Sequence, residues 1–165
     1  KKGKQMPTVS ARPALIDDLP VIVGLLADDV LGQGRENIGP HLHSDYIDAF
    51  EAIDDDPNQV FAVFEAKGVI IGCLQLSFIP GLSRKGAWRG QIESVRISSE
   101  RRGAGLCQKM ISWAIDTCRN RGCRIIQLTS DKTRHDAAEF YRALGFVASH
   151  EGFKQSILEA PHIFL

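Results

Sequence analysis

Residues 98–110, "SSERRGAGLCQKM", combine two glycines, two preceding arginines and a helix-type apolar spacing after them. Glycine turns the chain sharply and leaves backbone N–H groups open to whatever lies in front of them. Because free N–H groups at a helix N-terminus attract phosphate, the stretch predicts either a phosphate site or a tight strand-to-helix turn. A dinucleotide fingerprint and a Walker loop would each need glycine at position 108, where Gln108 stands. Both nucleotide motifs are therefore excluded.

Hydrophobic periodicity predicts the elements that position this stretch. We expect helices over residues 17–32, 44–53, 106–121 and 135–144, and strands over 8–13, 59–66, 69–79, 87–97, 123–130, 147–150 and 153–158. In the strand before the glycines, Gln91, Glu93, Val95 and Ile97 are expected on one face. The apolar run at 123–130 predicts a strand buried on both faces near the centre of the sheet. The order of elements predicts an α/β domain with a mixed sheet.

Composition limits the classes of function. The 165 residues suit one domain over 8–165, with 1–7 as a disordered tail or a cloning remnant. A formal net charge of zero gives no overall attraction to nucleic acid or to an acidic membrane surface, and no apolar run is long enough for a membrane span. Four cysteines without a C-x-x-C pair predict reduced thiols and a cytoplasmic location.

Two segments resemble the Gcn5-related N-acetyltransferase (GNAT) superfamily: "IESVRISSERRGAGLCQKMI" and the later "LTSDKTRHDAAEFYRALGF". In that family [QR]-x-x-G-x-[GA] binds the pyrophosphate of acetyl-coenzyme A, and A-x-x-[FL]-Y-x-x-x-G-F supplies the helix beside the thiol. A register that begins at Arg102 places Gly105 and Cys107 in the small-residue positions, and Cys107 departs from the family's glycine or alanine. The resemblance extends over residues 8–157 and implies a mixed, mostly antiparallel sheet of about six to seven strands flanked by about four helices.

The resemblance also implies the residues that bind acetyl-coenzyme A as co-substrate. They are the end of the strand, the glycine turn and one later arginine: Val95, Arg96, Ile97, Arg102, Gly103, Ala104, Gly105, Leu106, Cys107 and Arg134. Arg134 stands where the family often has asparagine, and it could reach a phosphate instead. Cys107 could act as a nucleophile at a helix N-terminus, but no histidine is adjacent to activate it.

Acetyl transfer to an amine needs a base, because an amine with a pKa near ~10 arrives protonated. Glu93 is the candidate base, and we expect it to be partly buried on the strand that leads to the glycine turn. The alternative is a sheet-surface glutamate paired with Arg89 or Arg96. Tyr141 resembles the family tyrosine that protonates the leaving thiolate or orients it. The alternative for Tyr141 is an ordinary core aromatic.

The predicted function is therefore an N-acetyltransferase that moves an acetyl group to a primary amine of a small molecule or peptide by direct attack in a ternary complex. A non-catalytic acetyl-coenzyme A-binding or sensing module and a protein N-acetyltransferase remain alternatives. No metal is expected, since His41 and His43 in a polar loop lack a further ligand set. The acceptor is expected to contact the first two helices, their loop and the 80–91 connector. Whether the chain is a monomer or a homodimer stays open.

Overall fold

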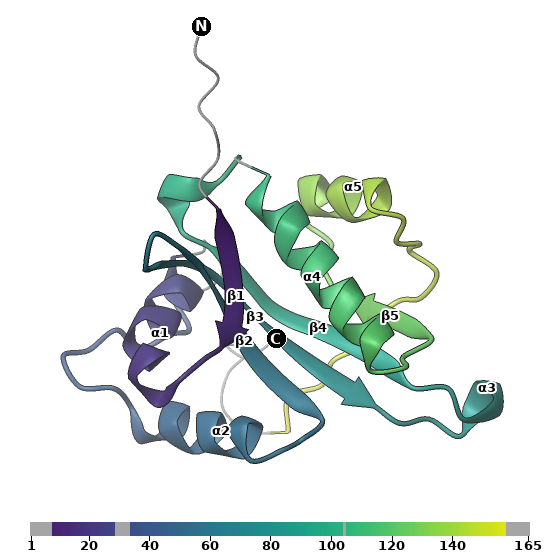
Figure 1. Ribbon diagram of the computed structural model, residues 1–165, viewed down its shortest axis with the longest axis horizontal. Coiled ribbons are helices and arrows are strands. Elements are labelled where there is room, and N and C mark those ends of the chain that lie inside the picture. Colours follow the sequence, from purple (N-terminus) through teal and green to yellow (C-terminus); the bar gives the residue numbers. More distant parts are fainter. Residues whose placement is uncertain (1–7, 29–33, 104, 158–165) are drawn as a thin grey trace, which may run out of the picture.

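The computed structural model describes residues 8–28, 34–103 and 105–157, and its centre is a twisted five-stranded sheet (Figure 1). The strands follow chain order: β1 (Val9–Pro13), β2 (Gln59–Ala66), β3 (Val69–Ile79), β4 (Arg89–Ile97) and β5 (Ile125–Leu128). The first four pair antiparallel, and β5 pairs parallel with β4. Lys67 and Gly68 close the β2–β3 hairpin with φ of 53° and 75°, the left-handed values that a tight hairpin turn requires.

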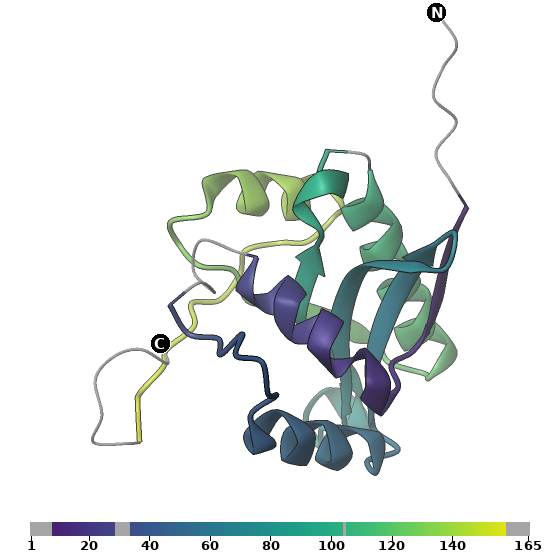
Figure 2. The same cartoon turned by 90° about the vertical axis from the view of Figure 1, so that its left-hand side faces the viewer.

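Helices cover both faces of the sheet. On one face lie α1 (Leu19–Ala27), which follows a 3₁₀ turn at Ile16–Asp18, and α2 (Ser44–Asp54). On the other face lie α4 (Leu106–Asn120) and α5 (His135–Ala143). A one-turn helix, α3 (Ser83–Gly86), stands in the β3–β4 connector, and a 3₁₀ turn at Ser99–Arg101 follows β4. Figure 2 views the molecule from the side that carries α1 and α2.

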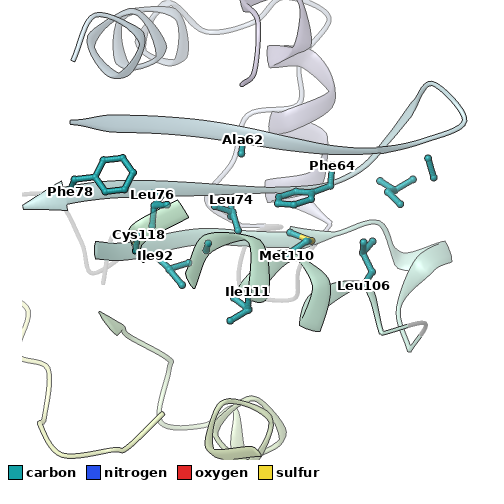
Figure 3. Close-up of a cluster of buried hydrophobic side chains, with 13 residues drawn as sticks. Ala62, Phe64, Leu74, Leu76, Phe78, Ile92, Leu106, Met110, Ile111 and Cys118 are labelled. Atoms are coloured by element: carbon teal, nitrogen blue, oxygen red, sulfur yellow. The ribbon is translucent and has the colours of Figure 1, made fainter. Parts of the chain in front are cut away.

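Two apolar clusters, one on each face, fix these layers. The larger one joins inward-facing strand residues to the apolar stripe of α4, which includes Met110, Ile111 and Ala114, each fully buried (Figure 3). The smaller one joins Val63 and Cys73, also fully buried, to side chains of α1 and α2. Successive residues of a strand point to opposite faces, so the strands are apolar on both sides wherever a helix covers them.

The sheet is smaller than predicted, because the described residues contain five strands rather than six to seven. The predicted strand at 147–150 is absent, and the one at 153–158 is absent over its described part, 153–157. Their apolar side chains face solvent instead: Val147 is 81% exposed, Phe153 91% and Ile157 94%. β5 consequently lies at the sheet edge in the described part of the chain. The prediction that its residues are buried on both faces near the centre is wrong.

The helix predicted for 17–32 begins later than expected, because a separate 3₁₀ turn at Ile16–Asp18 precedes α1. Asp18 rather than Asp17 is the residue before α1, and its carboxylate accepts a hydrogen bond from the Leu15 backbone N–H at 2.7 Å. Arg12 on β1 contacts both this carboxylate and Glu65 on β2 at 2.7 Å, which ties the turn to the sheet. Residues 29–33, with the predicted end at Gly32, lie outside the described residues, as do 1–7 and 158–165. The single-domain organisation over 8–165 stays a prediction.

Candidate functional site

A bulge in β4 opens the sheet next to β5. Cys73 pairs with Arg96 but Gln75 pairs with Glu93, so three steps along β4 oppose two along β3. Ser94, inside the bulge, has a φ of 54°, a left-handed value that is uncommon for a residue with a side chain. β4 pairs with β5 only from Arg89 to Ile92. The segment Val95–Ile97 therefore has no ladder partner in β5, which leaves backbone groups of β4 open on that side.

The bulge also reverses which side chains face α4. Ile92 before the bulge belongs to the core under α4, and Val95 and Ile97 after it pack against the same core. Glu93 is the cross-strand partner of Gln75, on the face of α1 and α2. The prediction that Glu93 shares a face with Val95 and Ile97 is wrong, because the extra residue shifts the alternation by one.

Glu93 is exposed, so the predicted partial burial is wrong as well. Within the described residues its carboxylate forms no hydrogen bond or ion pair, and the alternative pairing with Arg89 or Arg96 is not observed there. Arg96 is half-buried and donates from Nη1 to the Val95 carbonyl at 2.9 Å. A carboxylate in this position can accept a proton directly or through water.

The glycine turn leads directly into α4, and no side chain caps the N-terminus of this helix. Gly103 and Gly105 have φ of 80° and 70°, the left-handed region that glycine enters without steric cost. Gly105 is the residue before α4. The first backbone N–H groups of a helix have no partner inside it, so those of Leu106 and Cys107 can bind an anion. Ala104 lies outside the described residues.

Arg102 is held by the end of α1. Its Nη2 donates to the backbone carbonyl of Asp28 and lies 3.5 Å from the Asp28 carboxylate. The same carboxylate accepts the Ser99 backbone N–H at 3.0 Å. Asp28 therefore fixes the start of the glycine turn against α1. Local sequence patterns do not predict this contact, because it joins residues 71 and 74 positions apart.

Tyr141, Cys107 and Arg134 form one cluster beside the start of α4. Tyr141 and Cys107 are half-buried against the α4-side core, whereas Arg134 is exposed. Burial raises the pKa of the Tyr141 hydroxyl, the Cys107 thiol raises it further, and Arg134 and Arg96 oppose the shift. Burial likewise raises the pKa of the Cys107 thiol, against the effect of Arg134. A protonated phenol suits a proton donor, and a protonated thiol is a poor nucleophile.

Aromatic contacts hold the Tyr141 ring. Its centroid lies 5.3 Å from that of Phe140 and 5.8 Å from that of Phe146, both in edge-on geometry. Within the described residues no group hydrogen-bonds its hydroxyl. Tyr141 therefore has both a packing role and an available O–H group, so the two interpretations of the sequence are compatible.

Some residues of the predicted acceptor region stabilise α2 and the loop before it. His43 precedes α2, and its Nδ1 accepts the Asp45 backbone N–H at 3.3 Å. Tyr46 on α2 donates to the Glu36 carboxylate at 2.7 Å and accepts the Asn37 backbone N–H at 3.0 Å. The helix thus fixes part of the preceding loop, while His43 acts as a helix cap.

Comparison with known proteins identifies similar chains. The model of the acetyltransferase (GNAT) family matches residues 29–146. The chain is 23% identical over 152 residues, 92% of this chain and 94% of the relative, to aminoalkylphosphonate N-acetyltransferase of Salmonella typhimurium. A solved Bacillus halodurans structure described as a transcriptional regulator is 45% identical with a TM-score of 0.88, covering 91% of this chain and all of that one.

A third relative is similar in fold. The structure of a predicted acetyltransferase with acetyl-CoA from Clostridium acetobutylicum has a TM-score of 0.69 and 21% identity, covering 94% of this chain and 100% of that chain. In the described ranges of our protein, every helix is too short or too polar to cross a membrane.

Proposed function

This chain belongs to the acetyltransferase (GNAT) family, whose members use acetyl-coenzyme A as co-substrate, and we propose that it transfers the acetyl group to a primary amine of a small molecule or peptide. The transfer occurs by direct attack in a ternary complex. The observation that carries the proposal is the splayed end of β4. There an uncapped helix N-terminus and the Tyr141 hydroxyl lie on the α4 side of the sheet, and the Glu93 carboxylate lies on the other.

The residues present fit acetyl-coenzyme A. The pyrophosphate would lie at the α4 N-terminus, against the N–H groups of Leu106 and Cys107. Flanking contacts would come from Arg102, Gly103, Gly105 and Arg134. Ala104 belongs to the same assigned group but lies outside the described residues. The open backbone edge at Val95, Arg96 and Ile97 would receive the pantetheine arm and the acetyl carbonyl. Cys107 is small enough for this position, although it leaves less room than glycine or alanine.

Each proton and electron pair in the reaction has a place to go. Glu93 accepts a proton from the substrate ammonium, and the freed lone pair attacks the thioester carbonyl carbon. The C–N bond forms as the C=O π electrons move onto oxygen, where a backbone N–H of the splayed strand stabilises the negative charge. Collapse of this intermediate breaks the C–S bond, and the departing thiolate takes the proton of Tyr141. The attacking nitrogen loses its second proton, which restores the Tyr141 phenol through solvent, and Glu93 releases its own proton to solvent. The products are the acetylated amine and free coenzyme A.

A screen for thiol release tests the proposal. The intact protein is incubated with acetyl-coenzyme A and a panel of small amines and amino-terminal peptides, and free thiol should appear with at least one acceptor. Preference within the panel separates small-molecule from protein N-acetylation. With that acceptor, Glu93→Gln should lower kcat by about 10²-fold near neutral pH, while Glu139→Gln, an exposed carboxylate on α5, should not. An unchanged rate for Glu93→Gln would refute the assignment of the base.

A sensing module is the second candidate, and the Bacillus halodurans relative described as a transcriptional regulator favours it. In that case the same turn binds acetyl-coenzyme A and no group is transferred. Calorimetry that detects binding of acetyl-coenzyme A, together with no turnover across the amine panel, would support this alternative.

We also propose a cytoplasmic location, which the free thiols of the described cysteines suit. Sedimentation would decide between monomer and homodimer.

A further inference from the structure

A continuous row of neutral polar side chains crosses the sheet from β2 to β5. Gln59 pairs with Ser77, Ser77 with Gln91, and Gln91 with Gln127, so each of four neighbouring strands contributes one member. We call these four residues the glutamine row. Neighbouring strands are about 4.8 Å apart, so the row places four polar side chains side by side across the sheet.

The row faces the same side as Glu93. On each strand its neighbours point into the α4-side core, as Val60, Leu76, Ile92 and Ile126 do. Strand alternation places the row on the opposite face. The adjacent cross-strand pair on that face is Gln75 and Glu93. The proposed base therefore borders the row.

Hydrogen bonds hold the amides in place. Gln59 Oε1 accepts Gln75 Nε2 at 2.9 Å and the Ser77 hydroxyl at 3.3 Å. Gln91 Oε1 accepts Gln127 Nε2 at 2.7 Å. A glutamine amide offers two N–H donors and a carbonyl acceptor, so these bonds leave groups over. Among the described residues, nothing donates to Gln127 Oε1. Gln59 Nε2 donates one N–H to the Asp56 carboxylate at 3.1 Å, and Gln91 Nε2 donates one to the Ile92 carbonyl at 3.4 Å, so each of these nitrogens keeps a second N–H.

Helices cover this face only in part. α1 and α2 bury Val63 and Cys73, at the other end of the same face. The members of the row are half-buried, except for Gln127, which is exposed together with Glu93. The open part of the face thus lies over β4 and β5, next to the end of their pairing at Ile92.

We propose that the glutamine row binds the body of the acceptor, and that the acceptor is a small amine that carries several hydroxyl groups. This rests on the proposed function, because Glu93 receives the ammonium end. A hydroxyl group both donates and accepts, so it matches the leftover amide N–H and C=O groups and the Ser77 hydroxyl. A carboxylate or phosphonate would offer no donor to the amide oxygens, and it would place negative charge beside Glu93.

Matched acceptors test the substrate class. Wild-type kcat/KM should be highest for glucosamine, lower for cyclohexylamine, which has a similar ring without hydroxyls, and lower for 2-aminoethylphosphonate. Gln91→Met and Gln127→Met should each reduce the preference for glucosamine over cyclohexylamine by about 2- to 10-fold, the range for one hydrogen bond. Asn120→Met, at the exposed end of α4, is the control and should leave this preference unchanged. A preference for the phosphonate, or one that both row variants leave intact, would overturn the inference.

Direct binding separates this inference from the proposed function. Glucosamine is titrated without acetyl-coenzyme A, while the side-chain amide resonances of Gln91 and Gln127 are followed by NMR. Shifts of both resonances without any acetyl transfer would refute the enzyme and retain the row as a binding surface. Acetyl transfer to glucosamine without these shifts would retain the enzyme and overturn the row. Because Gln127 is exposed, its variant decides the question even if Gln91→Met does not fold.

Discussion

In the proposed reaction, the hydroxyl of Tyr141 gives its proton to the leaving thiolate. Burial and the nearby Cys107 raise its pKa above the ordinary value of about 10. The phenol consequently stays protonated throughout the neutral range. It loses the proton only at a pH above that of a free tyrosine, and Arg134 and Arg96 limit this shift without reversing it.

Tyr141→Phe should lower kcat by about 10²-fold and leave the Kd for acetyl-coenzyme A nearly unchanged. The ring contacts with Phe140 and Phe146 persist in this variant, so its Tm should stay close to that of the wild type. Steady-state kinetics between pH 6 and about 11 would check the result. In the wild type, the loss of kcat caused by Tyr141 should occur above pH about 10 and be absent from the variant. Equal kcat values in the two proteins would show that the Tyr141 hydroxyl has no role in the reaction and that the ring only packs.

In the register that begins at Arg102, Cys107 stands where the family has glycine or alanine. If the register from Arg102 is correct, Cys107→Gly should keep or improve the affinity for acetyl-coenzyme A, because it widens the space in front of the α4 N-terminus. Cys107→Phe should weaken that affinity by at least about 10-fold, through overpacking of a half-buried site. Calorimetric titration measures both, with the Tm as a folding control. Indifference to both changes would exclude the proposed phosphate position.

Much of this site is predictable from residue types. The glycine turn and Tyr141 follow from a local pattern, and the structure places Cys107, Arg134 and Tyr141 near one another. The exposure of Glu93 could not be predicted, because it depends on the unpaired residue in β4 and on where α1 stops covering the sheet. The Asp28 contact to Arg102 and the cross-strand register of the glutamine row are likewise long-range properties.

The helix α4 lies close against β4 because residue 90 of the strand is glycine. A Cβ atom at Gly90 would lie 2.1 Å from the Cys118 sulfur, far inside contact distance, and 3.4 Å from the Cys118 Cβ. Gly90 therefore sets how near the helix can approach the strand that contains the bulge at Ser94. The glycine is needed for space, since its φ is not in the left-handed region.

Gly90→Ala should lower the free energy of unfolding by about 1–3 kcal/mol, the usual cost of overpacking a core. Cys118→Ala removes the sulfur that would collide, and in the double variant the added methyl has an ordinary contact. The effects should therefore be strongly non-additive, with the double variant more stable than Gly90→Ala alone. Urea denaturation of all four proteins measures this coupling. Additive losses would show that the sulfur is not the obstacle.

Local patterns predict the elements themselves better than their arrangement. The β2–β3 hairpin has the predicted limits, because the Lys67–Gly68 turn interrupts two clear strand patterns. The run at 123–130 is apolar enough for a central strand, yet β5 pairs only with β4 in the described residues, and Gln127 faces solvent. Apolar content alone therefore did not establish the position of the strand. The strands predicted after α5 are absent from residues 147–157, because β propensity alone does not provide a pairing partner.

In the whole molecule, the sheet separates two tasks. Its α4 face carries the buried core, the open helix N-terminus and Tyr141, which suit the acetyl donor. Its α1 and α2 face carries Glu93 and the glutamine row, which suit the acceptor. The bulge at Ser94 and the end of β4–β5 pairing at Ile92 open the sheet between these faces. Acceptor and donor would therefore meet at the splayed strand.

Acetyl transfer with isotope-labelled acetyl-coenzyme A distinguishes direct attack across this opening from transfer through an acetylated protein. The protein is incubated with the labelled donor alone, then with an acceptor found in the screen, and protein and products are analysed by mass spectrometry. We expect no labelled acetyl group on the protein, including Cys107, and no thiol release before the amine is added. Labelled acetyl-amine should then form in equal amount to free thiol. An acetylated protein that passes its label to the amine would contradict direct attack.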